Sequence, residues 1–377
     1  METLKIAIFS WESLYSDRVG GLASAATYMA QTLAKRHEVH FFTRGDKDFN
    51  LFNVQYHVWR PYGRNIIEYC NDLSHGLVAR FRDFDNPPFD IIHFNDWHVI
   101  EAMHLLKERN TVFSFHSTEY GRNGGYFGDW WEFKDISGKE WYGALIAKRV
   151  TAVSKTLCNE IVNLYNVPQW KTDVIPNGVV PEQFDVAIDP GDIKRRYGIH
   201  PFTPLILYIG RMAYQKGPDL FIDALPAIRA HRDDVRAICA GTGGMLQHLQ
   251  NSSYGLPVQF TGFISDSEYI RLLNASDIVV IPSRNEPFGI VLLEAWSARK
   301  GVVASAVGGL SENISHLEDG VLVEPSPQGI AWGVNEIINN PDMISSIGRK
   351  GRKKTDRLFH WKKISEQMVE VYKKAMQ

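Results

Sequence analysis

Two glutamates, Glu286 and Glu294, flank a short apolar stretch whose position could suit a ligand carrying hydroxyls and phosphate. Pro287 is compatible with the first position of a helix, because the amide that proline lacks would be unpaired there. We therefore expect a helix to begin beside Phe288–Ile290, with Glu286 on the preceding loop and Glu294 about a turn and a half further along. The open amides of a helix start attract anions. A nucleotide sugar, with hydroxyls at both ends and phosphate between them, has a matching shape.

The spacing of these glutamates says little alone, because the chain has 43 acidic residues and a surface acid beside a helix-face acid is an ordinary alternative. The preceding run Asp277–Ser283 favours a ligand site over that alternative. It is apolar and β-branched, as expected of a buried parallel strand. Ligands of open α/β sheets bind at the carboxyl ends of such strands, which is where Glu286 follows.

Two cations and a glycine-bearing turn could serve a phosphate group. Arg211 follows an apolar run and Lys216 precedes an expected helix. The planar guanidinium of the arginine and the compact ammonium group of the lysine could together bind a diphosphate. The segment Arg18-Val-Gly-Gly-Leu22 leads into another expected helix, where its glycine amides could approach a phosphate. Solvated cations and an ordinary tight turn are the alternatives.

Composition favours a two-domain enzyme without a nucleic-acid partner. The chain has 377 residues, 44% of them hydrophobic, which is too long for one core. Its 41 basic and 43 acidic residues give a net charge of −2, so the sequence has no excess of positive charge that would attract a nucleic acid. The three cysteines have no paired spacing, and no apolar run reaches the ~20 residues of a membrane span. With a strand expected almost at its start, the chain leaves no room for a signal peptide, and we expect a cytoplasmic protein.

Short apolar runs alternate with helical patterns in both halves, which predicts an α/β protein with parallel sheets. A helix is expected over 22–36. We expect domains at 1–180 and 190–359, a linker within 177–191, and a terminal helix, 360–377, packed on the first domain. The expected strands are Leu4–Phe9, Glu38–Thr43, Asn53–Trp59, Asp90–Phe94, Thr111–His116, Val150–Ser154, Thr172–Ile175, Leu205–Ile209, Val235–Ala240, Val258–Phe260, Ile278–Ile281, Val302–Ala304 and Gly320–Val323.

Read together, the motifs of the chain resemble those of retaining nucleotide-sugar glycosyltransferases with the GT-B fold, family 4 and its archaeal glycogen-synthase-like members. The likeness covers nearly the whole chain. The segments that carry it are Arg18-Val-Gly-Gly-Leu22, the His-x-x-Asp-Trp-His pattern at His93–His98, His116-Ser-Thr-Glu-Tyr-Gly121, Thr151-Ala-Val-Ser154, Ile175-Pro-Asn-Gly-Val179, Gly210-Arg211, Lys216-Gly217, Phe260-Thr-Gly-Phe263, Glu286–Glu294 and Ala304-Ser-Ala-Val-Gly-Gly-Leu310.

The resemblance implies two Rossmann-like β/α/β domains facing each other across a cleft, with the donor bound mainly by the second. It implies a catalytic set of His116, Glu286, Arg211 and Lys216. Arg211 and Lys216 would neutralise the diphosphate, and Glu294 would accept hydrogen bonds from the ribose. The full donor set implied is Arg18, Gly20, Gly21, Arg211, Lys216, Phe263, Ile264, Glu286, Phe288, Gly289, Ile290 and Glu294.

The expected reaction is retaining transfer of a hexose, glucose in the first instance, from UDP-glucose or ADP-glucose to a sugar or α-glucan. A nucleoside diphosphate leaves without a general acid, and fixed cations can stabilise its charge. Asp266 and Glu268 are expected to be helix N-terminal acids, not metal ligands. We therefore expect neither a metal nor a cofactor besides the sugar donor.

The acceptor side is expected to include Asp96, Tyr120, Trp130 and Trp131. Seven aromatic residues lie between Tyr126 and Tyr142, and exposed rings would suit sugar faces. Packing of these rings into the core is the alternative, as is a purely structural Asp96.

Some positions depart from the glycogen-synthase pattern. Arg18 stands where lysine is frequent, Asn95 where a second histidine is frequent, and Glu294 where many bacterial glycogen synthases lack a glutamate. The acceptor therefore stays open, with another small molecule or a lipid-linked sugar as alternatives. A GT-B nucleotide-sugar 2-epimerase and a non-catalytic nucleotide-sugar sensor are the competing functions.

Overall fold

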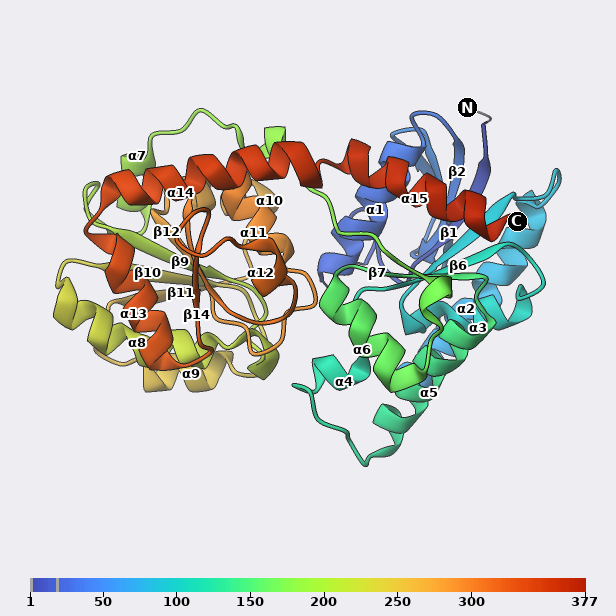
Figure 1. Cartoon of the computed structure of the whole chain (residues 1–377), viewed down its shortest axis with the longest axis horizontal. Helices are drawn as coiled ribbons and strands as arrows, with labels where there is room; N and C mark the ends of the chain where they lie inside the picture. The colour runs from blue at the N-terminus through green and yellow to red at the C-terminus, as the bar shows by residue number, and fades with distance from the viewer. Residues whose placement is uncertain (1–2, 18–19) are drawn as a thin grey trace. The chain divides into compact units, whose positions relative to one another are not determined.

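The computed structural model describes residues 3–17 and 20–377, and the chain forms two compact units (Figure 1). Unit 1 comprises Met1–Gly178 together with Trp361–Gln377, and unit 2 comprises Val179–His360. The chain therefore passes from one unit to the other twice, and its last helix belongs to the unit that its first strand begins.

Unit 1 contains an eight-stranded sheet in the order β3-β4-β2-β1-β5-β6-β7-β8. All neighbouring strands are parallel except β3, which pairs with β4 in antiparallel fashion. The central strands are buried on both faces, as parallel strands between helix layers must be. The strands are β1 Lys5–Phe9, β2 Glu38–Arg44, β3 Phe49–Leu51, β4 Val54–Trp59, β5 Ile91–Asn95, β6 Thr111–Phe115, β7 Arg149–Ala152 and β8 Thr172–Val174.

Helices cover both faces of this sheet. Helix α1 (Gly21–Leu33) packs against the terminal helix α15 (Trp361–Ala375) on one face (Figure 1). On the other, α3 (Ile100–Leu105) contacts both α2 (Ile66–Phe84) and α5 (Trp131–Ile146). The remaining elements are α4 Glu119–Arg122, α6 Lys155–Tyr165 and the 3-10 turns η1 Trp97–Val99 and η2 Gln169–Lys171.

A chain of buried hydrogen bonds fastens α15 to the sheet. The Tyr372 hydroxyl lies 2.8 Å from Nδ1 of His93, and Nε2 of His93 lies 2.6 Å from the Ser114 hydroxyl. Burial lowers the pKa of His93 to about 3, so its ring is neutral at physiological pH. Because each of these polar groups has a partner, the terminal helix can bury them without a large desolvation cost.

Unit 2 contains a six-stranded, fully parallel sheet in the order β11-β10-β9-β12-β13-β14. Helices α8 (Pro218–His231) and α13 (Pro327–Ile338) bury their apolar sides against one face. The strands are β9 Leu205–Ile209, β10 Arg236–Ala240, β11 Val258–Gly262, β12 Ile278–Ile281, β13 Gly301–Ser305 and β14 Val321–Val323. The other helices are η3 Pro181–Phe184, α7 Pro190–Arg196, η4 Tyr214–Lys216, α9 Leu246–Ser252, α10 Asp266–Ala275, α11 Ile290–Ser297, α12 Gly308–Asn313, α14 Pro341–Lys354 and the π-helical turn Thr355–Phe359.

The predicted α/β architecture is confirmed, and every strand expected from the sequence is present within two residues of its predicted ends. The short strand β3 was missed, because three partly exposed residues have no buried β-branched pattern. The helix expected over 22–36 spans Gly21–Leu33. Across residues 3–17 and 20–377, no helix is long and apolar enough to cross a membrane.

Candidate functional site

The loop after β12 in unit 2 places a buried carboxylate beside a lysine. Glu286 is 8% exposed, and its Oε2 accepts hydrogen bonds from the Ser283 hydroxyl at 3.0 Å and from Nζ of Lys216 at 2.8 Å. The lysine side chain keeps 25% of its surface accessible. The structure thus brings together two of the four expected catalytic residues, and the lysine can still meet a ligand.

Glycines allow these loops to approach each other. Gly217 has a φ of +63°, and a Cβ there would lie 2.0 Å from the carbonyl oxygen of Pro282 at the end of β12. Gly308 has a φ of +46°, and its Cβ would lie 2.1 Å from the carbonyl oxygen of Glu286. That same oxygen accepts the amide of Gly309 at 2.9 Å. Side chains at these positions would push Lys216 and Glu286 out of place, since real Cβ atoms do not approach oxygen so closely.

The second expected cation, Arg211, follows β9 and is exposed. Its Nη2 donates to Oε1 of Gln215 at 3.2 Å, which ties it to the turn that carries Lys216. Two nearby cations with accessible charge can neutralise a diphosphate. Lys216 is paired with Glu286, and a neighbouring arginine, Arg284, is likewise paired with Asp219 through two hydrogen bonds of 2.8 and 2.5 Å.

The start of α11 differs from the prediction. The helix begins at Ile290 and not next to Pro287, because Gly289 adopts a left-handed φ of +91° immediately before it. Phe288 precedes the helix and buries its side chain, with 3% exposed. The expectation that the amides of Phe288, Gly289 and Ile290 begin the helix is therefore wrong, because only Ile290 belongs to α11. All three residues still follow Glu286 closely in the chain.

Glu294 is the fifth residue of α11 and is half-buried. Its Oε2 accepts a hydrogen bond of 2.5 Å from the hydroxyl of Tyr269 on α10, a partner that the sequence did not reveal. Phe263 and Ile264 lie on the loop between β11 and α10, where Phe263 is 80% exposed and Ile264 is half-buried. An exposed ring at this edge of the sheet can stack on a planar base.

In unit 1, His116 directly follows β6. Its amide donates to Oδ1 of Asp96 at 2.8 Å, and its ring Nε2 lies 3.0 Å from Oδ1 of Asn95. Burial lowers the pKa of His116 to about 4, so the ring is neutral at physiological pH. A neutral imidazole can exchange hydrogen bonds with a sugar but carries no fixed charge.

Asp96 directs its carboxylate toward the backbone of the loop after β6. It is 5% exposed, and its carboxylate accepts the backbone amides of His116 and Ser117. Burial raises the pKa of Asp96 to about 6. Its backbone has a φ of +57°, which is uncommon outside glycine and is maintained here by the surrounding loop. The geometry therefore gives Asp96 a positioning role for the loop that begins at His116.

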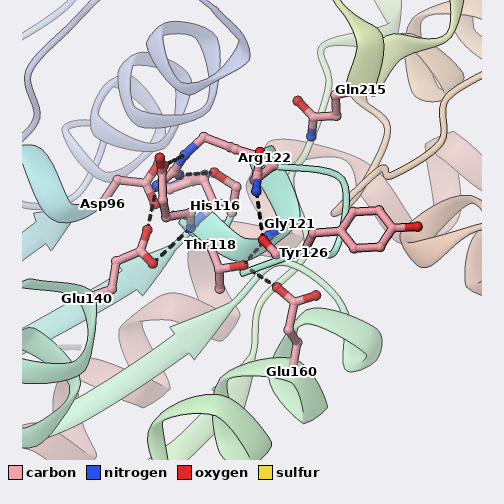
Figure 2. A network of polar contacts seen from close by, with 12 residues as sticks. Asp96, His116, Thr118, Gly121, Arg122, Tyr126, Glu140, Glu160 and Gln215 are labelled. Carbon is pink, nitrogen blue, oxygen red and sulfur yellow. Dashed lines mark hydrogen bonds and ion pairs between the residues drawn. The ribbon is translucent and has the colours of Figure 1, made fainter. Parts of the chain in front are cut away.

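A buried ionic network supports the same loop (Figure 2). The guanidinium of Arg122 donates to Glu140 at 2.6 Å and to Glu119 at 2.9 Å. Glu140, which is 1% exposed, also accepts the Tyr165 hydroxyl at 2.5 Å and the amide of Glu119 at 2.9 Å. Burial raises the pKa of Glu140 to about 7, although the charge of Arg122 acts in the opposite direction.

The rest of this network extends to α6, where Glu160 accepts the hydroxyl of Thr118. Sequence reasoning missed all of these supporting contacts. Their partners lie up to 42 positions apart, and isolated charged residues usually indicate a surface.

A small pocket in unit 1 opens beside His116. Its polar lining includes Asn95 and Asn177, which belong to two of the segments that carry the family resemblance. The full lining is Ala25, Met29, His93, Asn95, Ser114, His116, Thr151, Val153, Ile175, Pro176, Asn177, Trp361 and Met368.

The glycine turn before α1 is only partly described. Gly20 precedes the helix, Gly21 is its first residue, and the amide of Gly20 donates to Oε2 of Glu12 at 2.9 Å. Because that amide already has an acceptor, its use by a phosphate would require this contact to change. Arg18 lies outside the described residues.

The aromatic residues expected on the acceptor side are divided between surface and interior. Trp130 and Trp131 are 44% and 52% exposed, and Tyr120 is half-buried. Phe133 is 3% exposed, and its ring packs against those of Trp130 and Phe127. Within the described part of the chain, no three or more His, Cys, Asp or Glu side chains gather as a metal site would require.

Comparisons with known proteins agree with this architecture. The family model "Glycosyltransferase Family 4" matches residues 19–183, and "Glycosyl transferases group 1" matches residues 191–354. An uncharacterized glycosyltransferase of Methanocaldococcus jannaschii is 34% identical over 392 residues, covering 99% of both chains. The chain belongs to the family 4-type glycosyltransferases.

Other relatives of this glycosyltransferase include the glycogen synthase of Mycobacterium tuberculosis, 28% identical over 291 residues, covering 75% of this chain and 68% of that one. Sucrose-phosphate synthase from Thermosynechococcus elongatus has a TM-score of 0.80 at 22% identity and covers 98% of each chain. Anabaena HepE, solved with UDP-glucose, has a TM-score of 0.78 at 21% identity, covering 98% of this chain and 99% of that one. The predicted GT-B fold class is thereby confirmed.

Proposed function

We propose that this glycosyltransferase is a retaining hexosyltransferase that moves glucose from a nucleotide-diphosphate sugar to a sugar or α-glucan, without a metal ion. The observation that carries the proposal is the Lys216–Glu286 pair at the end of β12, with Arg211 tied to the same turn. It supplies positive charge for a leaving diphosphate next to an acid that can hold sugar hydroxyls. The glycogen-synthase relative and the UDP-glucose bound by a protein of the same fold support this choice of donor and acceptor.

In this mechanism the glycosyl–phosphate bond breaks while negative charge develops on the diphosphate. Lys216 and Arg211 stabilise that charge, and fixed charges do so without reorganising during the reaction. The departing phosphate oxygen accepts the proton of the attacking acceptor hydroxyl on the same face of the sugar, so the α-configuration is kept. Neutral His116 exchanges hydrogen bonds with the transferred sugar, Glu294 with Tyr269 binds the ribose, and the Phe263–Ile264 loop meets the base.

The test is release of nucleoside diphosphate across a matrix of UDP-glucose, ADP-glucose and other donors with several acceptors, including maltooligosaccharides. We expect release that requires an acceptor and persists in chelator. Conversion of the donor alone would identify an epimerase, and absence of turnover with every pair would favour a sensor. Turnover with a lipid-linked sugar only would move the acceptor to that class. Loss of turnover in chelator, restored by manganese or magnesium, would overturn the metal-free mechanism.

Two further measurements address stereochemistry and the roles of the glutamates. NMR of the first product should show an α-linkage, and a β-linkage from an α-linked donor would refute retention. Glu286→Gln should mainly lower kcat, because this residue adjoins the transferred sugar. Glu294→Gln should mainly raise the donor KM, because its role is binding.

A further inference from the structure

The outer face of α5 in unit 1 is unusually apolar for an exposed helix surface. The exposed residues of this helix recur at intervals of three and four, which places them on one side. Three of them are large and apolar: Trp131 is 52%, Trp141 46% and Leu145 58% exposed. The exposed positions are Trp131, Lys134, Asp135, Gly138, Trp141 and Leu145. Solvent-facing helix sides normally carry polar residues, so this side indicates a binding surface.

The loop before α5 carries more exposed rings, next to the first turn of the helix. Tyr126 is 71% exposed, Phe127 74% and Trp130 44%. Buried Phe133 anchors them, with its ring centroid 5.3 Å from that of Trp130 and 6.4 Å from that of Phe127. The rings of Phe127 and Tyr120 also lie 4.9 Å apart. Rings held in this way lose little conformational freedom when a ligand stacks on them. We call Tyr126, Phe127, Trp130, Trp131, Trp141 and Leu145 the α5 surface.

Gly138 lies in the middle of this helix side. A Cβ at this position would meet no atom within 4 Å, so packing does not require a glycine. Glycine in a helix interior costs about 1 kcal/mol relative to alanine. Its effect is to leave a shallow region between the two tryptophans, where an extended ligand could lie against the backbone.

The charges near the α5 surface favour a neutral ligand. Asp129, Glu132 and Asp135 lie in or beside the first turn of α5, against Lys134 there and exposed Lys148 just beyond the end of the helix. Helices that dock on anionic membranes carry Lys and Arg around their apolar residues, and an acidic border opposes such binding. Carboxylates accept hydrogen bonds from hydroxyls, and indole faces cover the apolar C–H faces of sugars.

The size of the surface favours a chain of sugars over a single one. Trp131 and Trp141 are ten residues apart, which corresponds to about 15 Å along the helix. We propose that the α5 surface binds a neutral polysaccharide, an α-glucan chain, and so holds a polymeric acceptor on unit 1. This inference deepens the proposed function and rests on it for the identity of the glucan.

Affinity electrophoresis of the full-length protein through gels containing glycogen tests the binding without a sugar donor. Wild type should be retarded, and Trp141→Ala with Leu145→Ala should raise the dissociation constant about tenfold, equal to about 1.4 kcal/mol. Trp332→Ala is the matched control, because Trp332 is 49% exposed on α13 of unit 2, outside the α5 surface, and should retain wild-type mobility. Thermal unfolding of each variant verifies folding, which changes at exposed positions should leave intact.

The outcomes separate this inference from the proposed function. If wild type is retarded and the double variant is not, the α5 surface binds the glucan. This conclusion holds even if no pair of donor and acceptor turns over, and in that case only the proposed function fails. Equal retardation of wild type and double variant, or none of wild type, overturns the inference. Two other results also overturn it. If wild type floats with phosphatidylglycerol vesicles and the double variant does not, the surface binds a membrane. If the double variant has a lower oligomeric mass than wild type in light scattering, the surface contacts a second copy of the chain.

Discussion

The two units use their polar side chains in opposite ways. In unit 2, Arg211 is exposed and Lys216 is partly accessible, so both can meet a ligand directly. In unit 1, Asp96 and Glu140 are almost completely buried, and their oxygens accept hydrogen bonds from the protein's own backbone and side chains. The difference predicts that the accessible cations of unit 2 meet substrate, whereas the buried carboxylates of unit 1 hold the loop that begins at His116.

Burial decides what a substitution should do in each unit. A buried charge that loses its partner keeps its desolvation cost, so damage in unit 1 should reach the folded state. An accessible charge that contacts a ligand should affect reaction rate more than stability.

The largest effect is expected from Arg122→Met in unit 1. It removes the partner of Glu140 from an interior site, which typically costs about 3–5 kcal/mol of unfolding free energy. Urea unfolding at pH 8 measures the change. Arg64→Met is the control, because Arg64 pairs with Glu68 on the surface with 80% of its side chain exposed, and solvent screens such pairs so that their loss should change stability little.

A second variant isolates the ion pair. Replacing Glu140 with Leu in the Arg122→Met protein removes the unpaired carboxylate and should recover part of the lost stability. Equal stability of Arg122→Met and Arg64→Met would show that the network does not support unit 1, and the contrast between the units would then be lost.

Lys216→Ala in unit 2 should act on catalysis. Loss of one fixed charge at the leaving group is expected to lower kcat about 10²–10³-fold, by analogy with the loss of an oxyanion donor. Lys216→Arg keeps the charge and should retain more activity than the alanine variant. Steady-state rates at saturating donor measure both. Near-normal turnover of Lys216→Ala would remove this residue from the chemical step.

The next effect is a pH dependence that comes from His93 in unit 1. Its pKa is about 3 in the folded state, because burial disfavours the charged ring, against about 6.5 in an unfolded chain. Between these values the unfolded chain binds a proton that the folded one does not. The contribution of His93 to the free energy of unfolding is therefore complete above pH 6.5 and decreases as the pH falls. Each pH unit in this window costs about 1.4 kcal/mol, so the loss at pH 4.5 is on the order of 2–3 kcal/mol.

Comparison with His93→Gln isolates that contribution, because other titrating groups remain in both proteins. Asp96, whose pKa is raised to about 6, contributes with the opposite sign in each. Urea unfolding from pH 7 to pH 4.5 should therefore show a shallower decline for the variant. Parallel curves would mean that the His93 ring takes up its proton in the folded state.

The contrast between the units also explains what the sequence could predict. The strands of both sheets were predictable, because buried parallel strands are continuous apolar runs such as Ile278–Ile281. The cations Arg211 and Lys216 were predictable because each adjoins a strand end or a helix start. The supporting contacts were not, since Tyr165 lies 25 positions from Glu140 and pairs with it only in the folded chain. The true start of α11 depends on the backbone of Gly289, which composition does not specify.

The smallest expected effect is that of Tyr269→Phe, and it sharpens the role of Glu294 in unit 2. The Tyr269 hydroxyl donates to Oε2 of Glu294 at 2.5 Å, so removing it should let the half-buried carboxylate move away from the position in which it would accept ribose hydroxyls. One hydrogen bond contributes about 0.5–1.5 kcal/mol, which predicts a donor KM raised by up to about tenfold at nearly constant kcat. Tyr254→Phe is the control, because Tyr254 is 96% exposed and should leave both constants unchanged. A fall in kcat at constant KM would place Glu294 at the chemical step, because a residue that only binds the ribose holds ground state and transition state equally.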